Sequence, residues 1–143
     1  MISDLPEPVA LGLLGKHTDR YQVVIARMAD ASLKIKALTA TAAGLLVSLA
    51  VERSQAGLLL VAGVLVLGLA ILDAYYLALE RGLRASSEAL PDLLSQDCAW
   101  QKLFRIELPA CSPKEVAASL GAPATAVFYL LLIGLLLLGW ALA

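Results

Sequence analysis

Three long apolar blocks dominate the pattern of hydrophobic and polar positions along this chain. The blocks cover residues 37–51, 56–79 and 122–143. A helix needs roughly 20 apolar residues to cross the ~30 Å hydrocarbon layer of a bilayer. The third block reaches that length without a charge, and the second does so with one, Asp73. The first becomes long enough if Lys34 and Lys36 extend their charged ends to the membrane surface. The pattern therefore predicts an all-α integral membrane protein with three transmembrane helices.

The segment before the first block predicts a basic amphipathic helix that continues into the first span, over residues 16–51. Arg20, Arg27 and Lys34 recur every seven residues and therefore share one side of a helix. Thr18 is a suitable N-cap, so residues 1–15 are expected to form a separate N-terminal arm. A helix that is basic in one half and apolar in the other can connect the membrane surface to its interior.

Polar segments separate the remaining predicted elements. Residues 52–55 predict a hairpin turn, and the second helix is expected to run from 56 to 90, beyond its span, until Pro91 ends it. Residues 91–121 form a cytoplasmic segment before the third span at 122–143. Within that segment, Ser112-Pro-Lys-Glu115 predicts a capping box for a two-turn helix. Residues 92–100 predict a short helix, and 104–108 an extended stretch.

Composition and charge support a membrane protein and suggest its orientation. The chain is 60% hydrophobic with a net charge of −1, and its mean hydropathy is +0.82, which excludes an ordinary soluble domain. Ten of the eleven lysines and arginines flank one membrane side, and only Arg53 lies in the turn between the first two spans. The positive-inside rule then predicts a cytoplasmic N-terminus and an extracytoplasmic C-terminus.

Nothing in the sequence favours an enzyme, a metal site or a cofactor. The chain carries no nucleophile elbow, no phosphate-binding loop and no cysteine–histidine cluster. His17 is interpreted as an exposed or capping histidine. Trp100 and Phe104 alternate with Lys102 and Arg105, a pattern that suits a single-stranded nucleic-acid site or, more commonly, a segment at headgroup depth.

Asp73 is the charged residue within a predicted span, and two interpretations remain open. An ionisable group inside a membrane is costly and often marks function, which favours a gate or an ion path. The first two spans are antiparallel neighbours, however, so Lys34 or Lys36 could reach the depth of Asp73 and form a structural ion pair with it.

Six cations on the cytoplasmic helices are candidate ligand-binding residues: Arg20, Arg27, Lys34, Lys36, Arg81 and Arg84. Attraction to anionic lipid explains those near the membrane. Arg20 lies about 25 Å and Arg27 about 15 Å before the first apolar block, at 1.5 Å per residue, so either ion pairs or a bound phosphate must account for them. Above them, Ala40, Gly44 and Ser48 form a ladder of small residues that allows close helix approach.

Two runs resemble a family of small bacterial membrane proteins similar to the membrane effector of the Hailong anti-phage system. They are Arg20-Tyr-Gln-Val-Val-Ile-Ala-Arg-Met-Ala-Asp-Ala-Ser-Leu-Lys-Ile-Lys36 and Leu72-Asp-Ala-Tyr-Tyr-Leu-Ala-Leu-Glu-Arg81, followed by Phe128-Tyr129. Leu33 and Ala37 stand where aromatic residues are expected. The resemblance implies an oligomeric channel held closed by an oligodeoxyadenylate that a partner nucleotidyltransferase makes.

The resemblance places ligand contacts on the six cations and a pore lining on the first span, at Thr41, Gly44 and Ser48, and it implies a place in the bacterial inner membrane. Asp73 joins these as a gate candidate because it is an ionisable residue within a span. Three spans enclose too little space for a pore, so conduction requires a symmetric homo-oligomer, with a tetramer favoured. The predicted function is a nucleotide-gated channel effector of anti-phage defence. The alternatives are a non-conducting interaction subunit of a membrane complex and a holin-like pore former.

Overall fold

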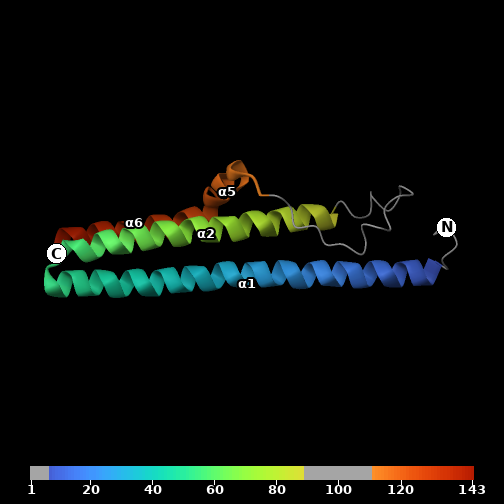
Figure 1. Cartoon of the computed structure of the whole chain (residues 1–143), viewed down its shortest axis with the longest axis horizontal. Helices are drawn as coiled ribbons and strands as arrows, with labels where there is room; N and C mark the ends of the chain where they lie inside the picture. The colour runs from blue at the N-terminus through green and yellow to red at the C-terminus, as the bar shows by residue number, and fades with distance from the viewer. Residues whose placement is uncertain (1–6, 89–110) are drawn as a thin grey trace.

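The computed structural model describes residues 7–88 and 111–143, and these residues form helices without any strand. The helices are α1 (Glu7–Arg53), α2 (Ala56–Glu88), α5 (Pro113–Leu120) and α6 (Pro123–Leu142). Figure 1 shows α1 and α2 side by side and antiparallel, with α6 beside α2 and the short α5 projecting from the side of α2. Predictions for residues 89–110, which include Pro91, the 92–100 helix and the aromatic–basic run at 100–105, lie outside the described residues.

Three of these helices are long and apolar enough to cross a membrane, as predicted: Gly15–Arg53 within α1, all of α2 and all of α6. At 1.5 Å per residue, α6 is about 30 Å long, whereas α1 is about 70 Å and α2 about 50 Å. All three reach the end of the molecule where the α1–α2 turn and the C-terminus lie (Figure 1). The excess length of α1 and α2 therefore extends beyond α6 at the opposite end as a two-helix stalk.

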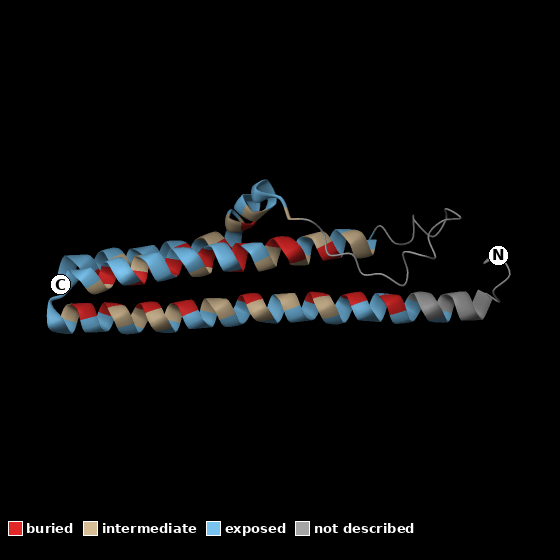
Figure 2. Ribbon diagram, viewed as in Figure 1, coloured by how far each residue is buried: buried red, intermediate tan, exposed pale blue. Residues whose placement is uncertain are grey.

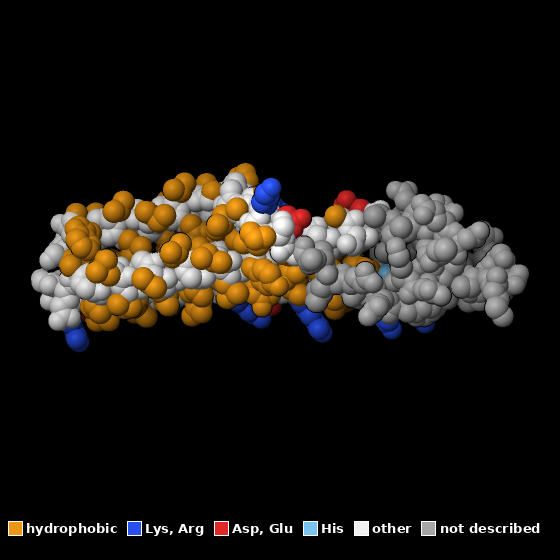
Figure 3. Space-filling view, turned by 45° about the horizontal axis from the view of Figure 1, so that its top comes forward, with side chains coloured by type: hydrophobic (Ala, Val, Ile, Leu, Met, Phe, Trp, Pro, Cys, Tyr) orange, Lys and Arg blue, Asp and Glu red, His pale blue; other side chains and the backbone are white. Residues whose placement is uncertain are grey.

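Large apolar side chains cover the outside of the three-helix part. Leu60, Val64, Leu67, Leu131 and Leu137 are each more than half exposed. The space-filling view shows such side chains distributed over this half of the molecule, with the charged ones gathered toward the stalk (Figure 3). A continuous apolar surface of this size is unfavourable in water and favourable in lipid, so the structure suggests a membrane location.

α1 begins earlier than its sequence pattern predicts. It starts at Glu7, so Thr18 lies inside the helix rather than at its N-cap, and no boundary separates an arm from the helix at residue 16. Pro8 falls in the first turn, where its missing N–H removes no helical hydrogen bond. The alanine- and leucine-rich residues that follow favour helix, and this continuity outweighs the two glycines among them.

The turns and caps follow the predicted chemistry. Between α1 and α2, Ser54 adopts the left-handed conformation with φ 49°, and the Gln55 N–H donates to the Ala50 carbonyl at 3.0 Å. At the start of α5, the Ser112 hydroxyl accepts from the Glu115 N–H at 3.3 Å, and Glu115 Oε2 accepts from the Ser112 N–H at 2.7 Å. The capping box is therefore confirmed, with Pro113 in the first turn.

The core is a narrow seam of small and medium side chains along the facing sides of the helices, visible as the row of buried positions in Figure 2. In the three-helix part, Ala43 packs with Val66, Ala70, Tyr129 and Leu132. Nearer the turn, Val47 and Ala50 pack on Leu59. Small side chains at these contacts let the helix backbones approach closely, which is the usual way helices associate in lipid.

The stalk has its own apolar contact. Tyr21 and Ile25 of α1 pack against Leu83 of α2, and all three are buried. His17 lies one turn before Tyr21, with its ring edge-to-face at a centroid distance of 5.0 Å. His17 is only 4% exposed, so its interpretation as an exposed histidine is wrong. The stalk therefore aligns the two helices beyond the reach of α6.

Candidate functional site

A buried polar cluster joins the three long helices around Asp73 of α2. The Asp73 side chain is fully buried. Its carboxylate forms an ion pair with the Lys36 ammonium of α1, at 2.6 Å to Oδ2 and 2.8 Å to Oδ1. The Ser32 hydroxyl of α1 donates to Oδ1 at 2.5 Å, and the Tyr129 hydroxyl of α6 donates to Oδ2 at 3.3 Å. One carboxylate thus connects both other long helices.

The spacing along α1 explains how this cluster forms. Ser32 and Lys36 are four residues apart and therefore lie on the same side of the helix, where Lys36 also donates to the Ser32 hydroxyl at 2.8 Å. Thr39 continues that side; its side chain is buried and satisfies its hydroxyl by donating to the Ile35 carbonyl at 2.7 Å. Each polar group has a partner, which makes a buried charge tolerable inside a span.

The ion-pair interpretation of Asp73 is confirmed, and Lys36 is its partner. Lys34, the other candidate, lies on the opposite side of α1 and pairs with Asp30 at 2.6 Å in an exposed contact. Because the Asp73 carboxylate is enclosed by its own chain, it lines no open path through this single chain. A role for Asp73 at the gate of an assembly stays a prediction.

The predicted basic face of α1 is exposed along its whole length. Arg20, Arg27 and Lys34 are exposed, and the helix continues from them to the equally exposed Thr41 and Ser48. At ~100° per residue around the helix axis, Arg20 lies about 60° from Thr41, and Arg27 and Lys34 lie between these two. Ser48 lies about 20° from Thr41 in the other direction, so the five positions share one side of α1. The buried positions of α1, among them Ser32 and Ala43, point the opposite way, toward α2 and α6.

At Gly44, the middle of the small-residue ladder at Ala40, Gly44 and Ser48, no other described helix approaches closely, so the use of the ladder as a close helix contact stays a prediction. A methyl group added at Gly44 would meet nothing within 4 Å. A close glycine contact lies instead at Gly139 of α6, where such a methyl would come within 2.8 Å of Val47 Cγ1 and 3.2 Å of Leu59 Cδ2. Gly139 lies where α6 crosses the seam between the other two spans.

The six predicted ligand-binding cations do not form one set. Arg20, Arg27 and Lys34 share the outer face of α1, whereas Lys36 points into the polar cluster. Arg84 and Arg81 belong to α2, which packs on the opposite side of α1. Arg84 forms an ion pair with Glu80 on its own helix at 2.7 Å. The outer face of α1 therefore retains three of the six cations.

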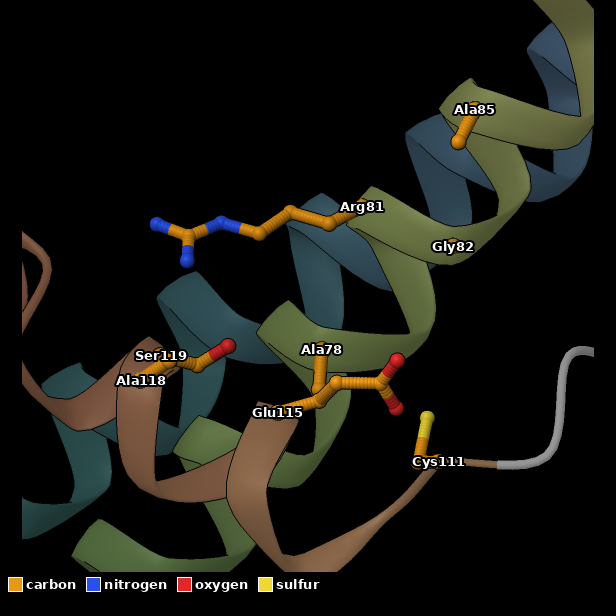
Figure 4. A pocket seen from close by; sticks show the side chains of 8 residues that line it. All are labelled: Ala78, Arg81, Gly82, Ala85, Cys111, Glu115, Ala118 and Ser119. Atoms are coloured by element: carbon orange, nitrogen blue, oxygen red, sulfur yellow. The ribbon is translucent and has the colours of Figure 1, made fainter.

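Arg81 lines a pocket of about 270 Å³ between α2 and α5 (Figure 4). The pocket walls are Ala78, Gly82 and Ala85 of α2 and Ala118 and Ser119 of α5, with Cys111 and Glu115 completing them. Burial and the neighbouring Glu115 carboxylate raise the pKa of the Cys111 thiol, which keeps it protonated and unreactive at neutral pH.

Sequence reasoning missed Ser32, Tyr129 and the α2–α5 pocket. The four-residue spacing of Ser32 and Lys36 could have indicated a shared partner for the two side chains. Nothing in the α6 sequence singles out Tyr129 as the third contact of Asp73. The chain matches no protein-family model, no curated protein and no solved structure.

Proposed function

We propose that this protein is a membrane channel effector that assembles around an axis lined by the outer face of α1 and is gated by a polyanion. The observation that carries the proposal is the continuity of that face. Three cations of α1, Arg20, Arg27 and Lys34, are followed on the same side by the exposed Thr41 and Ser48 within the apolar part, and Gly44 lies at the edge of this side, about 60° from Thr41. Arg20, Arg27, Lys34, Thr41 and Ser48 are all exposed, and Gly44 is half-buried.

Symmetric assembly would turn these positions into rings. Copies related by rotation about one axis present the same face to it, so each cation of α1 becomes a ring of cations. Successive rings at Arg20, Arg27 and Lys34 are about 10 Å apart along a straight helix, at 1.5 Å per residue. Phosphates are the natural ligands of such guanidinium groups, which form short, charge-assisted hydrogen bonds with them.

The same rotation would place hydroxyls and backbone along the membrane part of the axis. Thr41 and Ser48 are exposed, and the Thr41 hydroxyl donates to the Ala37 carbonyl at 2.9 Å, as helical threonines do when no other partner is present. Gly44 lies between them with open space around it. A mildly polar stripe of this kind is poorly suited to lipid and well suited to a narrow aqueous path.

The proposed gating depends on the repulsion between the α1 cations of neighbouring copies. Without a ligand, rings of like charge repel one another and favour separation of the stalks. A short single-stranded oligonucleotide neutralises the rings and holds the stalks together, which closes the path. This is the mode of control that the resemblance to the Hailong effector implies, with oligodeoxyadenylate as the ligand, a nucleotidyltransferase as its source and anti-phage defence as the setting. The stalks and the N-terminus are then cytoplasmic and the C-terminus extracytoplasmic.

Ion flux from liposomes tests the proposal. We expect the reconstituted protein to release ions, and an added oligodeoxyadenylate to suppress that release. Arg20→Glu combined with Arg27→Glu should weaken oligonucleotide binding by more than ~tenfold, because two charge-assisted contacts at ~1.5–3 kcal/mol each are lost. The matched control is Arg53→Glu, which changes an exposed arginine at the other end of α1 and should leave suppression intact.

The binding and flux measurements, together with the oligomeric state in detergent, also define the results that would contradict the proposal. Unchanged binding and unchanged flux in the double variant would refute the polyanion site. A monomer in detergent without flux would indicate a non-conducting interaction subunit. Flux that no nucleotide alters would indicate a holin-like pore former.

A further inference from the structure

The pocket between α2 and α5 combines charged, polar and apolar surface at one depth. Its walls are mostly alanine and glycine, which leave room beside the helix backbones. Arg81 extends over it from α2, and Ser119 faces it from α5 (Figure 4). Arg81 forms no ion pair with any residue in the described ranges 7–88 and 111–143. Among the described residues, the pocket therefore offers a cation without an ion-pair partner.

Ser119 is the second observation that indicates a ligand. The residue is fully buried, and its hydroxyl has no hydrogen-bond partner among the described residues. A buried hydroxyl without a partner is energetically unfavourable, because it has lost its hydrogen bonds to water. Serines within helices usually avoid that cost by donating to the carbonyl four residues earlier. An acceptor supplied from the pocket would satisfy Ser119, and an anionic oxygen would serve Arg81 at the same time.

Glu115 adds a charge of the opposite sign. Its Oε2 accepts from the Ser112 N–H as part of the capping box, and the carboxylate lies on the Cys111 side of the pocket, away from the Arg81 guanidinium (Figure 4). The pocket is thus positive at one end and negative at the other. A ligand with a phosphate and an amine separated by a short link would match both ends.

The depth of the pocket fits a membrane surface. Tyr129, which contacts Asp73, is six residues after the start of α6, or about 9 Å along the helix. α6 therefore begins about 9 Å nearer the stalk than Asp73, and its first residues mark the end of the span. Ala78 to Ala85 lie five to twelve residues beyond Asp73 on α2, or about 8–18 Å farther toward the stalk. This interval overlaps the headgroup layer that flanks the hydrocarbon core.

We propose that this pocket binds the headgroup of an amine-bearing phospholipid, with the phosphate at Arg81 and Ser119 and the ammonium at Glu115. The lipid would join α5 to α2 at the membrane surface and thereby fix the start of α6, which follows α5 directly. The inference needs a membrane location but neither conduction nor a nucleotide, so it stands or falls independently of the proposed channel.

Native mass spectrometry of the full chain in detergent micelles tests the site, with phosphatidylethanolamine, phosphatidylglycerol or phosphatidylcholine added. We expect the wild-type protein to retain phosphatidylethanolamine best. Arg81→Gln should lower retention of this lipid ~tenfold or more, since a charged hydrogen bond contributes ~1.5–3 kcal/mol. Ser119→Ala should lower it less. Arg84→Gln is the matched control, because Arg84 is one turn away on the same exposed helix and does not line the pocket.

Glu115→Gln separates headgroup recognition from folding. Glutamine also completes a capping box, so α5 keeps its N-cap while the pocket loses its negative charge. We expect this variant to retain phosphatidylethanolamine and phosphatidylcholine equally. Equal retention by the Arg81 and Arg84 variants would overturn the site. Displacement of the lipid by millimolar inorganic phosphate would overturn the lipid assignment in favour of a soluble phosphate ligand. Melting temperatures of all variants in detergent verify that each is folded.

Discussion

The two faces of α1 carry similar residue types but have different surroundings. On the inner face, Lys36 is largely buried and held by Asp73, and its neighbours Ser32 and Thr39 are satisfied within the chain. On the outer face, Lys34 has a side chain that is 75% exposed and pairs with Asp30 of its own helix. The two lysines are two positions apart, which puts them on nearly opposite sides of a helix.

The contrast shows that position along the chain does not define the role of a charge near a membrane. Both lysines precede the same apolar block and are equivalent by composition. One stabilises the fold of the single chain, whereas the other remains available to ligands, lipid or further copies. Substitutions on the inner face should therefore change stability, and substitutions on the outer face should change binding and assembly.

The largest effect is expected at Asp73. Asp73→Ala removes the partner of Lys36 and leaves a mostly buried ammonium uncompensated, which typically costs about 3–5 kcal/mol. Unfolding of the purified protein in detergent measures the loss. The double variant Asp73→Ala with Lys36→Met should recover part of the lost stability, because position 36 then carries an apolar side chain in place of an unpaired ammonium. The matched control is Asp30→Ala on the outer face, and a comparable loss there would contradict the distinction between the two faces.

A smaller effect is expected at Gly139, where α6 meets the inner faces of α1 and α2. The added methyl of Gly139→Ala would lie 2.8 Å from Val47 Cγ1, so the helices must separate slightly. Overpacking of this kind costs about 1–3 kcal/mol. Gly134→Ala, in the same helix, would meet nothing within 4 Å and should leave stability unchanged or raise it through helix propensity. Melting temperatures that fall equally in both variants would argue against this packing.

The smallest effect on stability is expected at Lys34. An exposed pair such as Lys34–Asp30 contributes about 0–1 kcal/mol, and salt screens it. Lys34→Gln should therefore shift unfolding by less than ~0.5 kcal/mol while reducing oligonucleotide binding and its salt dependence. Equilibrium binding at two salt concentrations measures this reduction. A variant that unfolds readily but binds normally would reverse the assignment of Lys34 to the outer face.

The sequence predicts the elements well because their signals are local. The apolar blocks, the α1–α2 turn and the capping box at Ser112 each depend on neighbouring residues. The start of α1 is missed, because residues near Thr18 suggest a cap that a continuous helix from Glu7 does not use.

The candidate sites are harder to predict from the sequence, because the residues that meet in each site are far apart along the chain. Pairing of Asp73 with a lysine of the first helix follows from antiparallel spans, but the choice of Lys36 depends on helix rotation. Tyr129 and the α2–α5 pocket depend on where α6 and α5 dock. The spacing of small residues suggested close helix approach at Ala40, Gly44 and Ser48, whereas a close approach within the described residues lies at Gly139.

The sequence by itself determined that residues 7–88 and 111–143 are mainly helical, that three segments can cross a membrane, and that ten of its eleven cations lie outside the turn between the first two spans. Length, hydropathy and charge count suffice for these conclusions, because each is a sum over neighbouring residues. Only the tertiary structure decided which face of α1 is buried. The buried face of α1 is set by how side chains fit together along the seam between the helices, and by the ion pair and hydrogen bonds that the Asp73 carboxylate requires. Both depend on three helices in contact.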